Sequence, residues 1–310
     1  MKKILIGIPC FNEEKNIEEC INSILSIKSE HEIQILVVND GSKDKSLEII
    51  NKLNNIKVIS SFVNEGLSEV FNSLMFYAKK QNFDFLIVFD ADGQYPSYDI
   101  PRIVEYAINS KSDIAIGTRD FKNNKIFSKY KNILQRLGSK IIGKILNLKI
   151  LDISSGFRIY SNKAFNVLFS GNNFTYTVET LFQAKSYGLE INQIPLTEFY
   201  ETRKSRLFKS NFEYIRKTVN IVFKSFMLYK TSATIKSLIL LFAIPGIGLL
   251  SRFFIPYFND GFNPGNIQSL IVGIGYIAIG SIFLVYLLLK IDNVKHYSYL
   301  KKRLYEPKHY

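Results

Sequence analysis

The sequence predicts an α/β domain with a mainly parallel sheet, followed by two helices that span a membrane. Three observations lead there. Short apolar runs alternate with helical patterns through the first 120 residues, positive charge is concentrated in two segments near the C-terminus, and long apolar stretches lie between those segments. With 310 residues, of which 47% are hydrophobic, the chain can form one large domain and a smaller appendage.

Short apolar runs are expected to form the buried strands: Ile4–Ile8, Ile35–Val38, Val58–Ile59, Phe85–Phe89 and Ile114–Ile116. Between them, apolar residues at helical spacing indicate helices: Glu14–Ser26, Lys45–Leu53 and Leu67–Lys80. Strands that are apolar throughout are typical of sheets covered on both faces, and their alternation with helices favours parallel pairing. Ligands bind such sheets beyond the carboxyl ends of the strands, so functional residues are expected there.

The net charge of +13 lies almost entirely beside the long apolar stretches. From Arg203 to Lys236 nine basic residues accompany one acid, and from Lys290 to Tyr310 six accompany two. A protein that binds nucleic acid would spread its cations over a folded face, so no nucleic-acid partner is expected. Two cysteines, Cys10 and Cys20, are too few for a disulfide framework and indicate a reducing, intracellular setting.

Two stretches have the ~20 residues that a spanning helix requires, Ser237–Phe258 and Ile267–Leu289. The second is uncharged, whereas the first contains Pro245 and, near one end, Arg252, whose long side chain can reach the interface. The alternative, two core helices of a soluble domain, is disfavoured because core helices of this length usually keep a polar face. The linking loop, Asn259–Asn266, has no Lys or Arg, so the positive-inside rule places both termini and the large domain in the cytoplasm.

The segment before the first span carries an apolar stripe at alternating steps of four and three residues. Its members are Phe208, Phe212, Ile215, Val219, Val222, Phe226 and Tyr229, and the cations Lys209, Arg216, Lys217 and Lys224 fall off the stripe. This pattern predicts an amphipathic helix that lies in the membrane surface or packs on the soluble domain. The expected organisation is a soluble domain over residues 1–205, a juxtamembrane helical segment over 206–232, a transmembrane hairpin over 233–290 and a basic tail over 291–310.

Polar clusters follow the first, second and fourth predicted strands. They read Pro9-Cys10-Phe11-Asn12-Glu13-Glu14, Asn39-Asp40-Gly41-Ser42 and Asp90-Ala91-Asp92-Gly93-Gln94. Asp90 and Asp92 are two residues apart, so a turn can direct both carboxylates towards one cation, and Gln94 adds a neutral oxygen. Such oxygen ligands suit Mg²⁺ or Mn²⁺, which commonly also bind substrate phosphates. The alternative for this motif by itself is a solvated acidic turn.

The series IPCFNEE, VVNDGS, DADGQ, GTR and D-x-x-SGFR, in this order and spacing, resembles family 2 glycosyltransferases of the GT-A fold. It is most similar to the polyprenyl-phosphate glycosyltransferases, the group that includes dolichol-phosphate mannose synthase, and the two spans match the layout of bacterial members. The resemblance covers about Lys3 to Arg206. It implies a Rossmann-like GT-A domain that moves a sugar from a UDP- or GDP-linked nucleotide sugar to a polyprenyl phosphate, such as undecaprenyl phosphate. The enzyme would sit in the lipid bilayer of the inner (plasma) membrane and serve cell-envelope glycan modification.

The resemblance also implies roles for single residues. Pro9, Phe11 and Glu13 would line the base and ribose of the nucleotide, Asp40 would hydrogen-bond the base, and Asp90 would lie at the nucleotide too. Asp90, Asp92 and Gln94 would hold Mg²⁺ or Mn²⁺ against the diphosphate.

On the acceptor side, the family's basic residues grip the lipid phosphate and the diphosphate of the nucleotide sugar. By position this set is Arg119, Lys131, Arg136, Ser139, Arg158 and Arg203. Arginine suits the task because its planar group makes paired, charge-assisted bonds to phosphate oxygens. Which of Lys131 and Arg136 meets the acceptor phosphate stays open, and Asp152 would orient the SGFR segment.

The sequence departs from the family at two places. Relatives typically have an arginine, a glycine and a serine spaced out before the membrane helix, whereas Glu201–Arg206 reads ETRKSR, without the glycine. The roles of Arg203 and Ser205 therefore stay open. Glu179 lies where other family 2 enzymes have a catalytic acid, and its role is open as well.

A phosphate acceptor removes the need for a general base, because a second pKa near ~6 leaves a phosphate monoester largely anionic at neutral pH. We therefore expect one in-line displacement with inversion, in which cations aim the acceptor oxygen and the metal neutralises the departing diphosphate. One alternative is transfer to a saccharide hydroxyl of a lipid-linked glycan, with Glu179 as base. Another is a non-catalytic membrane scaffold, which the intact Asp90, Asp92 and Gln94 disfavour. The sugar, the nucleotide and the oligomeric state, a homo-oligomer included, are left undetermined.

Overall fold

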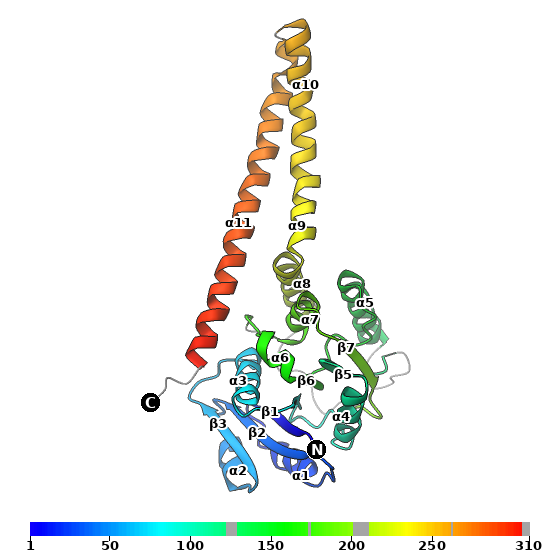
Figure 1. Cartoon of the computed structure of the whole chain (residues 1–310), viewed down its shortest axis with the longest axis vertical. Coiled ribbons are helices and arrows are strands. Elements are labelled where there is room, and N and C mark those ends of the chain that lie inside the picture. The colour runs from blue at the N-terminus through cyan, green and yellow to red at the C-terminus, as the bar shows by residue number, and fades with distance from the viewer. Residues whose placement is uncertain (122–128, 173–174, 201–210, 262, 306–310) are drawn as a thin grey trace. The chain divides into compact units, whose positions relative to one another are not determined.

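The computed structural model describes residues 1–121, 129–172, 175–200, 211–261 and 263–305. The chain divides into two compact units, Met1–Val222 and Phe223–Tyr310. The first unit holds an α/β sheet and the second holds two long helices (Figure 1).

The first unit is built on a seven-stranded sheet in the order β3-β2-β1-β4-β6-β5-β7. The strands are β1 (Lys3–Cys10), β2 (Glu32–Asp40), β3 (Ile56–Ser61), β4 (Phe85–Val88), β5 (Ile114–Thr118), β6 (Arg158–Ser161) and β7 (Ile191–Pro195). Within this sheet β6 runs antiparallel to β4 and β5, and the other neighbouring pairs are parallel. Strands β1 to β5 overlap the apolar runs listed above, which confirms the predicted mainly parallel α/β domain.

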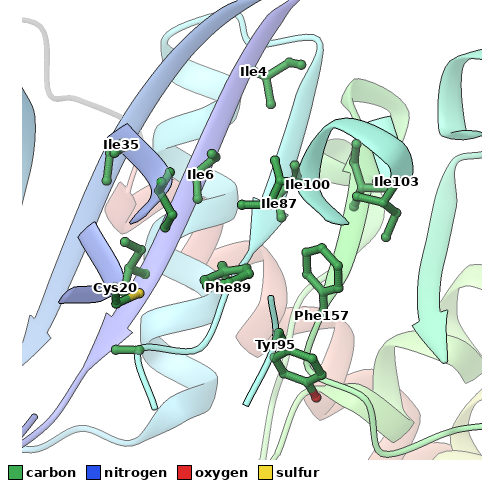
Figure 2. Packing of buried hydrophobic residues seen from close by; sticks show 14 of the residues in the cluster. Ile4, Ile6, Cys20, Ile35, Ile87, Phe89, Tyr95, Ile100, Ile103 and Phe157 are labelled. Atoms are coloured by element: carbon green, nitrogen blue, oxygen red, sulfur yellow. The ribbon is translucent and has the colours of Figure 1, made fainter. Parts of the chain in front are cut away.

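Helices cover both faces of the sheet. One face carries α1 (Ile17–Leu25), α2 (Ser46–Lys52) and α4 (Asp99–Asn109), and the other carries α3 (Leu67–Lys80), α6 (Asn162–Val167) and α7 (Thr177–Ser186). On the first face Ile100 and Ile103 of α4 pack beside Ile87 of β4 (Figure 2). On the second, Phe71 of α3 stacks on Tyr176 with ring centroids 4.3 Å apart. Because both faces are buried, the strands need apolar side chains throughout, as their sequences have.

Strand β6 is an element that the sequence pattern did not predict, since none of the expected apolar runs covers Arg158–Ser161. Its register pairs Arg158 with Val88 of β4 and with Ile116 of β5. Val88 is the last residue of β4, Ile116 lies two residues before the end of β5, and β6 runs the opposite way. The SGFR segment therefore enters the sheet at the edge where parallel strands place their ligands.

Helix α5 (Lys129–Leu146) lies between β5 and β6 in the chain and has two different faces. One face is buried and includes Asn132, Ser139, Ile142 and Leu146. On the opposite face, Ile133, Leu137 and Ile141 are at least half exposed, at 61%, 52% and 50%. The spacing of four residues aligns these three side chains on one stripe of the helix.

The second unit contains the C-terminal helices. After α8 (Asn211–Tyr229), which occupies most of the predicted amphipathic segment, come α9 (Thr231–Leu238), the π-turn η1 (Ile239–Ala243), α10 (Ile244–Asp260), the 3₁₀ turn η2 (Pro264–Asn266) and α11 (Ile267–Tyr305). Thr231–Asn259 and Pro264–Asn293 are each long and apolar enough to cross a membrane. Most of their side chains are exposed within the unit, which is typical of lipid-facing helices and not of a soluble core. Phe208 of the predicted stripe and the cation Lys209 beside it lie outside the described residues.

Glycines bring the two candidate spans close together. A Cβ at Gly273 of α11 would lie 3.1 Å from the carbonyl oxygen of Gly246 in α10, and a Cβ at Gly246 would lie 2.7 Å from Ile277. Close approach of this kind at small residues is how helices pack in lipid, where no hydrophobic driving force holds them together. The wide turn η1 ends two residues before Pro245, which lacks an N–H and cannot complete a regular helical bond there.

Candidate active site

The loops after β1 and β2 are joined into one rim at the carboxyl edge of the sheet. The backbone N–H of Asn12 donates to the hydroxyl of Ser42 at 3.0 Å, and the side-chain oxygen of Asn12 accepts from Lys43 N–H at 2.8 Å. The N–H of Glu13 donates to the hydroxyl of Ser46 at 2.7 Å. Because β1 and β2 are adjacent and parallel, these bonds link loops that are 30 residues apart in the chain.

The residues predicted to bind the nucleotide lie on this rim. Pro9 lies in β1 and is partly buried, the ring of Phe11 is exposed, and Glu13 is buried and accepts from the amide of Asn16 at 3.3 Å. Asp40 ends β2 and is buried. These side chains therefore lie at neighbouring strand ends, and their contacts with a nucleotide stay a prediction.

Asp40 binds the backbone of the loop that precedes α3 (Leu67–Lys80). One of its carboxylate oxygens accepts from the N–H of Glu65 at 2.7 Å, and the other accepts from the N–H of Gly66 at 3.0 Å. Gly66 directly precedes α3, so the carboxylate holds the two backbone N–H groups just before that helix and ties the β3–α3 loop to the rim.

Asp90 and Asp92 follow β4, next to β1 in the sheet, and both are partly buried. Gln94 donates its side-chain amide N–H to one oxygen of Asp92 at 2.7 Å and its backbone N–H to the other at 3.2 Å. The nitrogen of the Gln94 amide thus contacts Asp92, because two oxygens would repel each other at this distance. This contact orients Asp92, whereas the sequence assigned the Gln94 oxygen to a metal.

The donor set at Asp90 and Asp92 fits a Mg²⁺ or Mn²⁺ ion that is shared with a substrate. Within the described ranges there is no group of three or more His, Cys, Asp and Glu side chains that could enclose a metal by itself. Mg²⁺ is commonly held by one or two carboxylates while substrate phosphates and water complete its shell, and carboxylate oxygens also suit Mn²⁺. Two carboxylates at the mouth of the sheet match that arrangement.

Asp90 lies directly against Gly156 of the SGFR segment. A Cβ placed on Gly156 would be 2.5 Å from Oδ2 of Asp90 and 3.3 Å from its Cγ, which no side chain could tolerate without a shift. Two tyrosines hold the peptide groups of Gly156: its N–H donates to the hydroxyl of Tyr95 at 3.1 Å, and its carbonyl accepts from the hydroxyl of Tyr176 at 3.2 Å. Burial raises the pKa of both tyrosines, so both hydroxyls keep their protons at neutral pH.

Arg158 is fully buried and donates to three backbone carbonyls. Nε donates to Ser155 at 2.9 Å, Nη1 to Thr177 at 2.7 Å and Nη2 to Ile153 at 2.8 Å. In this structure the guanidinium holds the protein backbone, whereas the sequence assigned it to a substrate phosphate.

Arg119 is paired with Asp152 in the protein interior. Nε and Nη2 of Arg119 donate to the two oxygens of Asp152 at 2.6 and 3.0 Å, and the ring faces of Phe121 and Phe199 lie 5.0 and 5.1 Å from the guanidinium carbon. Burial by itself would raise the pKa of Asp152, but the charge and hydrogen bonds of Arg119, with a bond from Ser154, outweigh it and hold that pKa below its ordinary value.

Helix α5 supports this ion pair from its buried face. The hydroxyl of Ser139 accepts from the N–H of Ile153 at 3.3 Å, and the side-chain oxygen of Gln135 accepts from the hydroxyl of Ser154 at 3.2 Å. Arg136 lies on the exposed side of the helix. The side chain of Lys131 and the whole of Arg203 and Ser205 lie outside the described residues, so their predicted contacts stay predictions.

Glu179, whose role the sequence left open, is buried in the first turn of α7. One of its oxygens accepts from the N–H of Gly171 at 3.1 Å and from the side-chain amide of Asn172 at 2.7 Å. The carboxylate therefore organises the segment that leads into α7.

Tyr95, Gly156 and Tyr176 were not predicted as site residues. Gly156 lies inside the SGFR motif and Tyr95 directly follows DADGQ, so proximity to a motif was the available signal. Tyr176 gave none, because its hydroxyl meets Gly156 through a tertiary contact between segments that are 20 residues apart in the chain.

The chain is similar in sequence to known proteins. The family model described as "Glycosyl transferase family 2" matches residues 5–169, which contain most of β1 and the whole of β2 to β6. A dolichol-phosphate mannosyltransferase of Pyrococcus furiosus is 31% identical over 225 residues, which are 69% of this chain and 62% of that protein. A UDP-N-acetylglucosamine–dolichyl-phosphate N-acetylglucosaminyltransferase of Methanococcus voltae is 29% identical over 224 residues, which are 64% of this chain and 86% of that protein.

Solved structures show the same fold. Glucosyl-3-phosphoglycerate synthase of Mycobacterium tuberculosis, crystallised with Mn²⁺, UDP and phosphoglyceric acid, superimposes with a TM-score of 0.56. The match covers 74% of this chain and 78% of that one at 15% sequence identity. Similarity at this identity supports the GT-A-like architecture of the first unit. It does not identify the substrate, which has to be inferred from the residues of the site.

Proposed function

The chain belongs to glycosyl transferase family 2, and we propose that it transfers a sugar from a nucleotide sugar to a polyprenyl phosphate at a membrane surface. The names of two relatives, which act on dolichol or dolichyl phosphate, support this acceptor class. The two candidate membrane spans support it as well, because a polyprenyl chain resides in the bilayer.

The observation that carries the proposal is the exposed face of α5. The helix contains five basic residues and no acid, and its stripe of Ile133, Leu137 and Ile141 is exposed beside Arg136. A polyprenyl phosphate combines an apolar chain with an anionic head, and this face offers both matching surfaces. Basic residues beside an exposed apolar stripe are typical of helices that lie in a membrane surface.

On the donor side, we assign Asp90 and Asp92 as the carboxylates that would hold Mg²⁺ or Mn²⁺, with Gln94 orienting Asp92. When bound, the ion would neutralise charge on the departing nucleoside diphosphate. Pro9, Phe11, Glu13 and Asp40 stay assigned to the base and ribose, where the rim around Phe11 is accessible. Asp40 would act there chiefly by fixing the rim, given its two bonds to the β3–α3 loop.

On the acceptor side, Arg136 and Lys131 of α5, together with Arg203, are assigned to the acceptor phosphate. Arg119 is anchored by Asp152 next to Ser154 and stays assigned to the diphosphate. Ser139 supports this arrangement from the buried face of α5. Because a phosphate oxygen is already anionic, these cations would aim the nucleophile and no protein base would be needed.

The bonds of Glu179 favour a phosphate acceptor over a saccharide hydroxyl. A hydroxyl acceptor would need a base, and Glu179 is the residue that family position suggests for it. Its Oε2 is engaged by Gly171 and Asn172 inside the protein, which suits a structural carboxylate better than a proton acceptor at a reaction centre.

The organisation that goes with this function is also proposed. Residues 1–205 would form the catalytic domain in the cytoplasm, 206–232 an amphipathic segment, 233–290 a hairpin across the inner membrane and 291–310 a basic tail. Cations flank the hairpin and none lies between Asn259 and Asn266, which supports cytoplasmic termini.

The test uses the full-length protein in vesicles that contain undecaprenyl or dolichyl phosphate, with Mn²⁺ or Mg²⁺ and a panel of labelled UDP- and GDP-sugars. We expect label in a lipid that mild acid cleaves, and a loss of that label in Arg136→Gln. Lys52→Gln, on an exposed surface of α2, is the matched control and should keep full activity. Label that enters only a lipid-linked oligosaccharide would overturn the proposal in favour of the hydroxyl acceptor.

A further inference from the structure

The charged guanidinium of Arg158 is completely buried. Burying a guanidinium is costly unless its donors are satisfied. Among the described residues no carboxylate lies within ion-pair distance of it, and its bonds to the carbonyls of Ile153, Ser155 and Thr177 satisfy it instead. A residue this deep cannot contact a substrate phosphate, so its function must be exerted on the backbone that it holds.

Those three carbonyls belong to two segments. Ile153 and Ser155 lie just before Gly156, and Thr177 is the first residue of α7. The hydroxyl of Ser155 also donates to the carbonyl of Gly117 at the end of β5, at 2.6 Å. Arg158 therefore ties the SGFR segment to the start of α7, while Ser155 ties the same segment to the sheet.

Gly156 is held between these ties by the two tyrosine hydroxyls, Tyr95 on its N–H and Tyr176 on its carbonyl. The ring of Tyr95 lies beside that of Phe157, with centroids 5.6 Å apart, and both rings belong to the hydrophobic core of the domain (Figure 2). The peptide groups on both sides of Gly156 are consequently fixed to the core of the domain.

The open side of Gly156 faces the carboxylate of Asp90, so closely that a Cβ would fall 2.5 Å from Oδ2. The geometry assigns Arg158 and Gly156 as positioning residues. Arg158 fixes the SGFR backbone, and Gly156 on that backbone packs against the Asp90 carboxylate and determines its position. The inference rests on the proposed function, because Asp90 needs an exact position only if it is a ligand of the donor metal. Groups that orient a metal ligand commonly affect metal affinity as strongly as 10–100-fold.

The test measures Mn²⁺ binding to the full-length protein by the free-ion EPR signal, with and without UDP or GDP. Gly156→Ala should weaken Mn²⁺ binding by about tenfold or more, because the new methyl group displaces Asp90. Gly138→Ala is the matched control, since a Cβ there meets nothing within 4 Å, and it should bind Mn²⁺ as the wild type does. Thermal unfolding of each variant separates loss of fold from loss of binding.

Arg158→Lys tests the other half of the assignment. A lysine keeps the charge but cannot hold three carbonyls in the planar arrangement, so we expect Mn²⁺ affinity to fall in a protein that still folds. Tyr95→Phe removes the hydroxyl that accepts from Gly156 and should act in the same direction; it also serves if the Arg158 variant fails to fold. A purely structural Arg158 would lower the melting temperature and leave Mn²⁺ affinity of the folded protein unchanged.

The outcomes are distinguishable. Wild-type Mn²⁺ affinity in Gly156→Ala and in Arg158→Lys, together with its loss in Asp92→Ala, would overturn the inference and leave the proposed function intact. A raised KM for polyprenyl phosphate in Arg158→Lys, at unchanged Mn²⁺ affinity, would place Arg158 at the acceptor and also overturn it. Absence of Mn²⁺ binding in the wild type with either nucleotide would remove the metal from the proposed function, and the inference with it.

Discussion

The guanidinium of Arg119 and the carboxylate of Asp152 form a two-point ion pair in the protein interior, with N–O distances of 2.6 and 3.0 Å. The two residues are 33 positions apart, and the pair joins the turn after β5 to the segment before SGFR. The backbone N–H of Ser154 donates to Asp152 and its hydroxyl accepts from Arg119, so the pair belongs to a small network. The network connects the candidate phosphate-binding arginine to the rest of the site.

Removing Asp152 should destabilise the protein strongly. Asp152→Ala would leave the buried Arg119 without its counter-charge, and breaking such a pair typically costs about 3–5 kcal/mol of unfolding free energy. Asp152→Asn should cost less, because the amide oxygen can still accept one bond. Denaturant unfolding of the purified proteins checks the order. Glu48→Gln, in an exposed pair with Lys52, is the control and should unfold like the wild type.

The same pair predicts a pH dependence of stability at the acid end. The pKa of Asp152 is lowered in the folded state, so its contribution is complete above the unfolded-state pKa of about 3.8 and is lost as pH falls through the lower folded-state value. Stability at pH 5 to 7 should therefore not vary through this group. Unfolding free energies measured from pH 6 to pH 2.5 should converge for the wild type and Asp152→Asn at the lowest pH. Parallel curves would contradict the prediction.

The two cysteines should be inert in the folded protein. Burial raises the pKa of Cys10 to about 11 and that of Cys20 to about 12, so neither thiol forms the reactive thiolate at pH 8. We expect no reaction with a thiol reagent under native conditions and reaction of both thiols in denaturant. Rapid labelling of native protein at pH 8 would show that one of these residues is accessible.

Asp92 and Gln94 should differ in their effect on metal dependence. If Asp92 is a ligand, Asp92→Ala should abolish Mn²⁺-dependent transfer, whereas Gln94→Ala removes a residue that orients Asp92 and should raise the Mn²⁺ requirement by about tenfold. Activity titrated with Mn²⁺ separates the two. An equal and complete loss in Gln94→Ala would instead support the direct oxygen ligand that the sequence motif suggested.

The exposed stripe of α5 should contribute to binding of the lipid acceptor and not to the stability of the fold. Replacing Ile133, Leu137 and Ile141 together with serine removes apolar surface that the domain does not bury, so the melting temperature should change little. The KM for polyprenyl phosphate in vesicles should rise several-fold through lost contact with the bilayer and the chain. Leu25→Ser, an exposed leucine on α1, is the matched control. An unchanged KM would remove α5 from the acceptor site.

The sequence by itself determined the class of fold, the strands β1 to β5 and the two apolar helices. Each of these follows from local periodicity and length, which a chain expresses without knowledge of its tertiary contacts. It also identified the motifs at strand ends, because parallel strands always place their carboxyl ends on one edge of the sheet. The clustering of Asp40, Asp90 and the rim after β1 could be expected for that reason.

What the individual side chains do was decided by the tertiary structure. Arg158 and Arg119 look alike in the sequence, yet one is enclosed by backbone carbonyls and the other is paired with Asp152. Strand β6 inserts antiparallel between β4 and β5, and only this insertion brings Gly156 against Asp90. Contacts between segments far apart in the chain decide which residue pairs with a buried charge or packs against a glycine. Such contacts leave no periodic signal in the sequence.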